Sequence, residues 1–171
     1  MSAINGITPG AVYDSTERAQ GKGFAVGTKG FDHNGKEYLY CLVAASQNLV
    51  SGNVVSLCST AGVMFTATIY ATGAPAPGTG MPLGVVVASI TASASTYIWV
   101  QVYGSANVSI TDATASNLPG HLVIPASVSG AVRASGVATA SSFIEGMVFT
   151  VTASTGSTGA MFLSYPRLTA A

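Results

Sequence analysis

The chain has 171 residues, and only 7% of them are charged, with six Lys and Arg balanced by six Asp and Glu. An ordinary globular chain carries about 25% charged residues. Because binding to a phosphate backbone needs a basic surface, the zero net charge argues against a nucleic-acid partner. The mean hydropathy of +0.50 argues against general disorder. The length predicts one domain, or a domain plus an arm, with a sizeable core.

The few charges are unevenly distributed along the chain. Eight of the twelve lie before residue 38, and no charged residue occurs between Tyr38 and Thr111. The remaining four are Asp112, Arg133, Glu145 and Arg167. Because low charge promotes association, this pattern indicates a protein that works packed against another protein.

A membrane role is not expected from the sequence. No run of about 18 apolar residues is present, so no transmembrane helix is predicted. The N-terminus lacks a basic region followed by an apolar core, so a signal peptide is not expected either. Without secretion, Cys41 and Cys58 are expected to be reduced, with a disulfide between neighbouring strands as the alternative.

The first 23 residues differ in character from the rest of the chain. They mix Gly and Pro with polar residues and have no sustained hydrophobic period. Residues 1–23 are therefore predicted to form an extended N-terminal arm that orders against a partner, with at most one helical turn over residues 14–20. Residues 24–171 are predicted to form the folded domain.

Strand signals begin after this arm and continue to the C-terminus. The apolar run 37–43 follows the turn sequence Asp32-His33-Asn34-Gly35, which is typical of a β-hairpin. Further short strands are expected at 53–58, 63–70, 83–90, 97–103, 107–110, 121–124, 130–134, 143–152 and 160–165, with a Pro- and Gly-rich loop at 71–82. Such spacing predicts an all-β fold, a small antiparallel β-barrel or sandwich.

The run from Tyr97 to Tyr103 is the clearest strand. Ile98, Val100 and Val102 share one face, and the other face carries Tyr97, Trp99, Gln101 and Tyr103. If exposed, Trp99 and Tyr103 would offer stacking platforms for a carbohydrate. The alternative, which we favour, is that this face lies in the core or in an oligomer interface.

The sequence contains little that resembles a catalytic or metal site. His33 and His121 have no defined partners, and no Gly-x-Ser-x-Gly motif is present. The two Cys and two His match no metal-ligand spacing, and the Gly-Thr-Gly sequence at 78–80 lacks the rest of a phosphate loop. We therefore predict no catalytic, cofactor-binding or metal-binding residues, and a protein that is not an enzyme.

Several short motifs occur in the order found in one protein family. They are Phe24–Thr28, Gly35–Cys41, Gly84–Val86, Tyr97–Gly104, Leu118–Gly120, Ile144–Met147 and Tyr165–Arg167. In this order the chain resembles the capsid cement, or head decoration, proteins of tailed bacteriophages. Ile98 stands where the family often has Gly, and the loop at 71–82 has no counterpart.

The resemblance implies a structural virion protein with a β-barrel fold. It would be made in the host cytoplasm and would bind the outer surface of the head, where it would stabilise contacts between major capsid protein subunits. It would act as a homo-oligomer, with a trimer favoured over a dimer. Candidate contact residues are Glu17 and Arg18 in the arm, and Trp99 and Tyr103 at an exposed edge expected around Trp99. The alternative is a receptor- or carbohydrate-binding module of a virion fibre or spike.

Overall fold

The computed structural model describes residues 3–60, 63–69, 81–91, 95–111, 118–119, 121–126, 130–135, 142–150 and 158–170. Over these residues the chain is mostly β, which confirms the predicted class. The elements are β1 (Ala3–Asn5), β2 (Val12–Tyr13), α1 (Ser15–Ala19), β3 (Lys29–Phe31), β4 (Glu37–Val43), β5 (Asn48–Leu49), β6 (Val54–Thr60), β7 (Val63–Ile69), β8 (Met81–Val86), β9 (Ile90–Thr91), β10 (Tyr97–Ser109), β11 (Leu122–Pro125), β12 (Val132–Ser135), β13 (Ser142–Phe149) and β14 (Thr158–Ala170).

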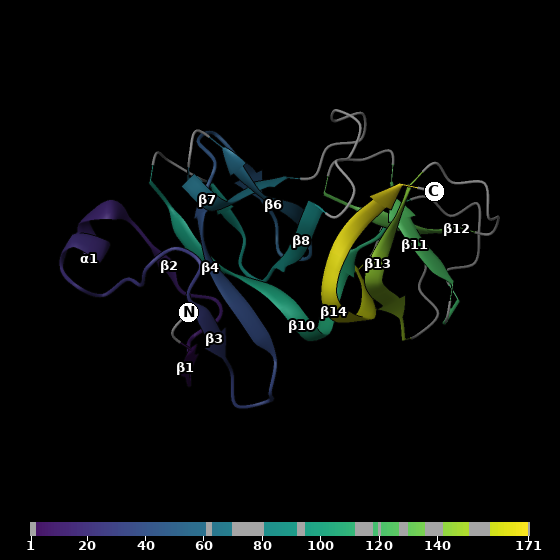
Figure 1. Cartoon of the computed structure of the whole chain (residues 1–171), viewed down its shortest axis with the longest axis horizontal. Helices are drawn as coiled ribbons and strands as arrows, with labels where there is room; N and C mark the ends of the chain where they lie inside the picture. Colours follow the sequence, from purple (N-terminus) through teal and green to yellow (C-terminus); the bar gives the residue numbers. More distant parts are fainter. Residues whose placement is uncertain are drawn as a thin grey trace.

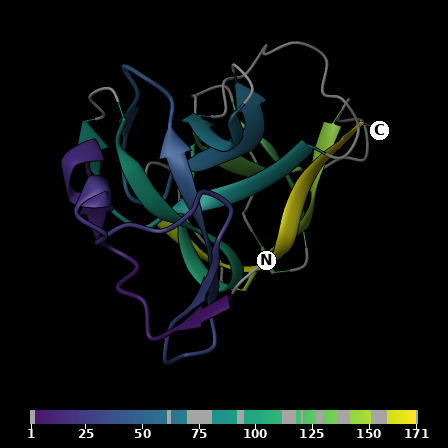
Figure 2. The same ribbon diagram turned by 60° about the vertical axis from the view of Figure 1, so that its left-hand side comes forward.

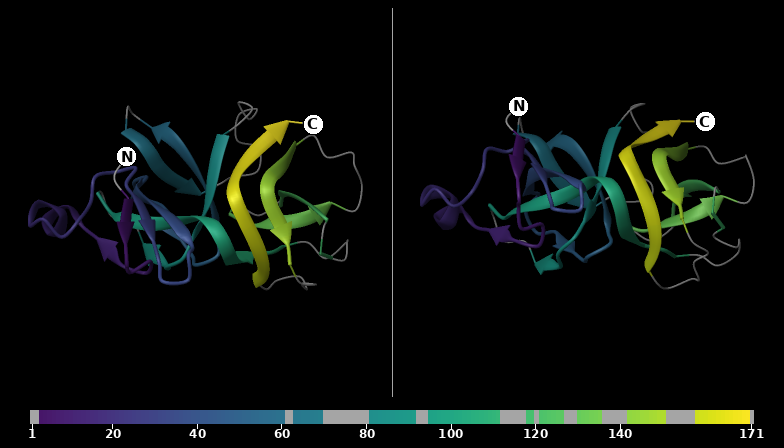
Figure 3. Two further views of the ribbon diagram at one scale, coloured as in Figure 1. Left: turned by 60° about the horizontal axis from the view of Figure 1, so that its bottom comes forward. Right: turned by 90° about the horizontal axis from the view of Figure 1, so that it is seen from below.

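Most strands belong to one large sheet with the order β1-β3-β4-β7-β6-β8-β10-β14-β13, and β2 adds to β10. Two small sheets, β11–β12 and β5–β9, stand apart from it. The sheet is mixed rather than purely antiparallel, because β1 pairs parallel with β3 and β4 pairs parallel with β7. In Figures 1 and 3, α1 lies at one end of the molecule and β12 and β13 lie towards the other.

Part of the large sheet closes on itself. β4 pairs with β7, β7 with β6, β6 with β8 and β8 with β10, and β10 pairs back with β4. These five strands enclose an apolar core that includes Cys41, Val55, Ile98 and Val100. A second core lies between β10, β13, β14 and the β11–β12 pair, around Val108, Phe149 and Leu163.

β10 is the strand that connects these two regions (Figure 1). Its first half pairs with β4, and its second half pairs with β14. As predicted, Ile98, Val100 and Val102 point into one core, while Tyr97 and Trp99 point to the opposite side. The strand is longer than expected because the predicted strands at 97–103 and 107–110 are one continuous element.

Residues 3–23 do not form the extended arm expected from the sequence. β1 pairs with β3, and β2 pairs with the beginning of β10, so the segment lies on the sheet. Figure 2 shows this segment, in purple, beside β3 and β4. Ile7 and Tyr13 order it by packing on buried aromatic side chains of β4 and β10. Two isolated apolar residues suffice for this contact, so no period appears in the sequence.

The first hairpin forms as predicted. β3 and β4 are antiparallel, and Asp32 Oδ1 closes the turn by accepting from the backbone N–H groups of Asn34 and Lys36 at 2.8 and 3.0 Å. Gly35 takes the left-handed conformation, with φ of 74°. Most of the predicted loop at 71–82 lies outside the described residues.

Candidate interaction surface

The residues predicted to make contacts fall into two separate places. Glu17 and Arg18 lie on α1, and Trp99 and Tyr103 lie on β10. Trp99 is only 1% exposed, so the exposed edge expected around it does not exist. Tyr103 is half-buried and begins the second half of β10, in which buried and more exposed residues alternate.

Trp99 belongs to a buried group of rings that we call the aromatic cluster, consisting of Tyr13, Phe24, Tyr40, Tyr97 and Trp99. Tyr40 stacks on Tyr97 with 5.9 Å between ring centroids, and it meets Trp99 edge-on at 5.1 Å. Phe24 and Tyr13 cover the group from the N-terminal side. Burial raises the pKa of Tyr40 to about 12. Through Tyr13, the N-terminal segment is thus part of this aromatic core.

Arg18 links α1 to this cluster. Its guanidinium lies 4.8 Å from the centroid of the Tyr97 ring and donates to the Tyr97 hydroxyl at 3.1 Å. Its Nε also donates to the carbonyl oxygen of Phe24 at 3.3 Å. Arg18 therefore makes its contacts within the chain, where it holds the N-terminal segment on the sheet.

Glu17 is used locally in the same helix. Its backbone N–H donates to Asp14 Oδ1 at 2.7 Å, and its carboxylate accepts from the backbone N–H of Asp14 at 3.3 Å. This reciprocal arrangement is a capping box, which satisfies N–H groups at the start of a helix. It explains why a five-residue helix forms at this place.

Tyr103 belongs to an exposed group that we call the waist patch, consisting of Tyr103, Val148, Phe162 and Tyr165. The Tyr103 ring lies 5.4 Å from the Phe162 ring and 5.7 Å from the Tyr165 ring. Val148 faces Phe162 across the β13–β14 pair. The exposed fractions are 46% for Val148, 39% for Phe162 and 45% for Tyr165. Sequence reasoning found Tyr103 but not the other three, because they lie on strands that meet β10 only in the fold.

The waist patch holds half of the exposed large apolar side chains in the described part of the chain. Six such side chains are exposed there, and three of them are Val148, Phe162 and Tyr165. Isolated apolar side chains on a surface need no explanation, whereas a contiguous apolar group with a polar border is typical of a protein-binding site. The waist patch is therefore the best candidate for an interaction surface.

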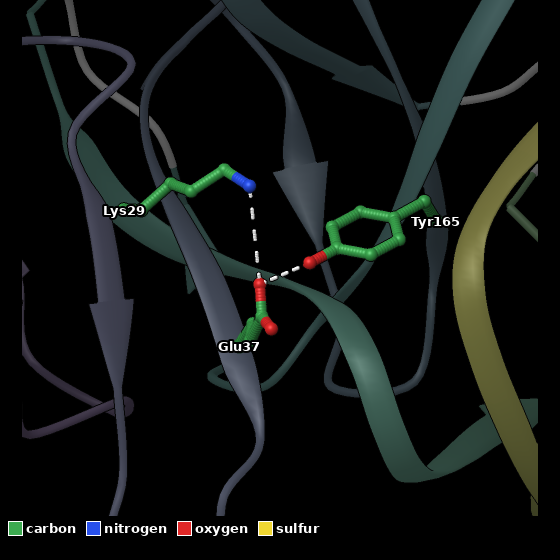
Figure 4. Close-up of polar contacts among 3 residues, drawn as sticks. All are labelled: Lys29, Glu37 and Tyr165. Carbon is green, nitrogen blue, oxygen red and sulfur yellow. Dashed lines mark hydrogen bonds and ion pairs between the residues drawn. The ribbon is translucent and has the colours of Figure 1, made fainter. Parts of the chain in front are cut away.

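A polar network borders the patch on the side of β3 and β4. The Tyr165 hydroxyl donates to Glu37 Oε2, and the same oxygen lies 3.9 Å from Lys29 Nζ (Figure 4). The Lys29 ammonium also lies 5.0 Å from the centroid of the Tyr165 ring. The hydrogen bond to Glu37, with some burial, raises the pKa of Tyr165 to about 12. The network joins the first hairpin to the C-terminal strand.

A bend in β14 directs Tyr165 towards this network. Tyr165 has φ of 49°, and Gly146 on the facing strand has φ of 72°. The register of β13 against β14 shifts between Glu145 and Met147, which is the mark of a bulge. A Cβ atom at position 146 would lie 2.3 Å from the Ser164 carbonyl oxygen, so only glycine fits.

A hollow of about 250 Å³ lies next to Tyr165. Its walls are mainly apolar and come from β4, β6, β8, β10 and β14, with Arg167 at the border. The lining residues are Leu39, Leu57, Pro82, Leu83, Val102, Tyr165, Pro166 and Arg167. Arg167 is paired with Glu145 at 2.9 Å, so the hollow carries no unpaired guanidinium charge.

The described residues contain no group of three or more His, Cys, Asp or Glu side chains that could hold a metal ion. Cys41 is a free, buried cysteine and takes no part in a disulfide, and burial raises the pKa of its thiol far above the usual value. Among the same residues, no helix has the length and apolar character needed to span a membrane.

The sequence was compared with protein-family models and with curated protein sequences. No protein-family model matches the chain, and no curated protein sequence matches it. The likeness to phage head decoration proteins therefore depends on the ordered motifs alone. Four of these motifs lie on β4, β8, β10 and β14, strands that pair with one another around the hollow and the waist patch.

Proposed function

We propose that this chain is a structural virion protein that binds the outside of a bacteriophage head and stabilises contacts between major capsid protein subunits. The observation that carries the proposal is the waist patch, an exposed aromatic surface with a charged border on a protein that is otherwise poor in charge. Interfaces between proteins have this composition, with aromatic residues at the centre and polar residues around them.

The fold gives further support to this proposal. We propose that the closed circuit of β4, β7, β6, β8 and β10 is the small β-barrel of the decoration family. Tyr97–Gly104, the longest of the resembling motifs, forms the first part of β10 and lies in this circuit. The balanced charge of the chain suits a protein that binds other proteins and leaves the packaged DNA alone.

On a closed shell, such a protein would gain binding strength from repetition. A standard protein interface buries about 1,600 Å² in total. Many copies bound to one shell raise its stability together, because each added contact opposes separation of the capsid subunits. A homo-oligomer would extend each contact over neighbouring subunits.

The carbohydrate-binding alternative loses its main support in the structure. Trp99 was its strongest stacking platform, and the ring is covered by Phe24 and Tyr40. A sugar would have to stack on Tyr103, Tyr165 or Phe162, and at Tyr165 the hydroxyl is bonded to Glu37 while the Lys29 ammonium lies over the ring. We therefore favour the capsid-binding function.

The test uses heads assembled from the major capsid protein whose gene lies nearest to the gene for this chain. The purified full-length protein should cosediment with heads that lack their decoration and raise the temperature at which they break. Phe162→Ser should weaken the binding about tenfold or more, whereas Val50→Ser, at an exposed site outside the patch, should not. Failure of the wild-type protein to bind these heads would refute the proposed function.

A further inference from the structure

Two Asn–Gly sequences lie close together at the β1 edge of the large sheet. Asn5 of β1 pairs with Phe31 of β3, and the residue after Phe31 begins the turn that contains Asn34 and Gly35. The Asn and the Gly of both sequences are exposed. Gly6 and Gly35 share a φ of 74°, and an added Cβ atom would meet nothing within 4 Å at either position. Both sequences are therefore open to solvent water.

An exposed Asn–Gly sequence contains the reacting groups for its own deamidation. The backbone nitrogen of the glycine gives up its proton and bonds to Cγ of the asparagine, while the side-chain nitrogen takes up a proton and leaves as ammonia. Water then adds to either carbonyl carbon of the resulting succinimide ring and opens it to aspartate or to isoaspartate. The attack is intramolecular because it joins neighbouring residues, and glycine has no Cβ atom to hinder the approach.

The two glycine nitrogens are held differently. The Gly6 N–H donates to the Phe31 carbonyl oxygen at 2.9 Å, and the next residue, Ile7, packs on buried aromatic side chains of β4 and β10. The Gly35 N–H donates to the Asp32 carbonyl oxygen at 3.2 Å, within the turn itself. A nitrogen must leave its hydrogen bond before it can attack. Freeing Gly6 disturbs an apolar contact, whereas freeing Gly35 opens only an exposed turn, which costs less free energy.

We propose that Asn34 is a site of spontaneous deamidation, which proceeds faster there than at Asn5. The isoaspartate product alters the fold most, because it routes the main chain through Cγ and adds a methylene group between residues 34 and 35. Asp32 Oδ1 accepts from the backbone N–H groups of Asn34 and Lys36, which lie on either side of this insertion. We expect the lengthened turn to lose one of these bonds and to loosen.

The modification also adds a charge near the waist patch. Either product replaces a neutral amide by a carboxylate, on a chain whose net charge is zero. Glu37, which accepts from the Tyr165 hydroxyl at the border of the patch, begins β4 directly after the turn. Loosening of the turn therefore reaches the polar network beside the patch. The site at Asn34 is independent of the proposed function, and only a consequence for head binding would rest on it.

Peptide mapping of the folded full-length protein, sampled during incubation in a warm, mildly alkaline buffer, tests the site. Trypsin cuts after Lys29 and Lys36, so residues 30–36 are released as a peptide in which Asn34 is the single asparagine. Its aspartate and isoaspartate forms should accumulate, with isoaspartate in excess. They should form about tenfold faster than the same products at Asn5, because Gly35 is freed more easily than Gly6. Circular dichroism confirms that the incubated protein stays folded.

Two matched variants separate the chemistry from general instability. Gly35→Asn keeps a residue that tolerates positive φ but adds a Cβ atom, and it should slow conversion at Asn34 about tenfold. Gly6→Asn makes the same change in the other sequence and should leave the rate at Asn34 unchanged. An unconverted Asn34, faster conversion at Asn5, or an equal rate in Gly35→Asn would overturn the proposal.

Hydrogen exchange measures the effect of the modification on the fold. Ion exchange separates the isoaspartate form, which should exchange faster over residues 29–37 than fresh protein does. Unchanged exchange there would overturn the expected loosening of the turn. If fresh protein never binds heads, the proposed function fails, whereas the peptide map of Asn34 still stands.

Discussion

The aromatic cluster and the waist patch lie on the same long strand, yet one is buried and the other is exposed. All six residues of β10 from Tyr97 to Val102 are buried, whereas burial alternates from Tyr103 to Ser109. The first half lies within the closed circuit of strands and is covered from outside by the N-terminal segment. The second half has a core on one face only.

Both groups consist of aromatic and apolar side chains, and they differ in whether another part of the chain packs over them. Tyr13 and Phe24 come from outside the circuit and cover Tyr40 and Trp99. No described segment covers Phe162 and Tyr165 in the same way, and both remain exposed. An aromatic sheet face therefore becomes core where a described segment packs over it, and it stays exposed where no described segment does.

The largest expected effect comes from removing a ring from each group. Trp99→Ala should lower the free energy of unfolding by about 3–5 kcal/mol, because a buried aromatic side chain is lost and a cavity remains. Phe162→Ala should cost less than about 1 kcal/mol in the monomer, since its ring is partly exposed. Trp99 is the single tryptophan, so its substitution removes tryptophan fluorescence as a probe. Denaturant unfolding of both variants is therefore followed by circular dichroism. Equal losses would show that the two groups are not distinct.

A smaller effect is expected from the bend that builds the waist patch. Gly146→Ala should cost about 2–3 kcal/mol, because a side chain there is strained at positive φ and meets the Ser164 carbonyl oxygen. Gly6→Ala is the matched control, since Gly6 has φ of 74° but open space around it. It carries the strain without the collision and should cost less. Thermal unfolding of both variants gives the difference, and equal costs would contradict the steric role of the bend.

The sequence predicted the strands and turns better than it predicted which segments pack over the sheet. The strand at 37–43, the Asp32–Gly35 turn and the two faces of the strand at 97–103 followed from alternation and turn residues, which are local properties. The position of residues 3–23 did not, because two apolar contacts made across a long sequence separation leave no periodic signal. The waist patch was missed for the same reason, since Phe162 and Tyr103 are brought together by strand pairing alone.

The smallest effect is expected from loosening the N-terminal segment that covers the aromatic cluster. Arg18→Met keeps the aliphatic part of the side chain but removes the contact with the Tyr97 ring and the donations to Tyr97 and Phe24, at a cost of about 1 kcal/mol. Hydrogen exchange should become faster in residues 3–23 and at Tyr97, while β13 and β14 should be unaffected. Lys22→Met removes the same charge from an exposed site and should change neither region. If Arg18→Met speeds exchange equally in β14, the N-terminal segment covers more than the aromatic cluster, and the two halves of β10 are not independent.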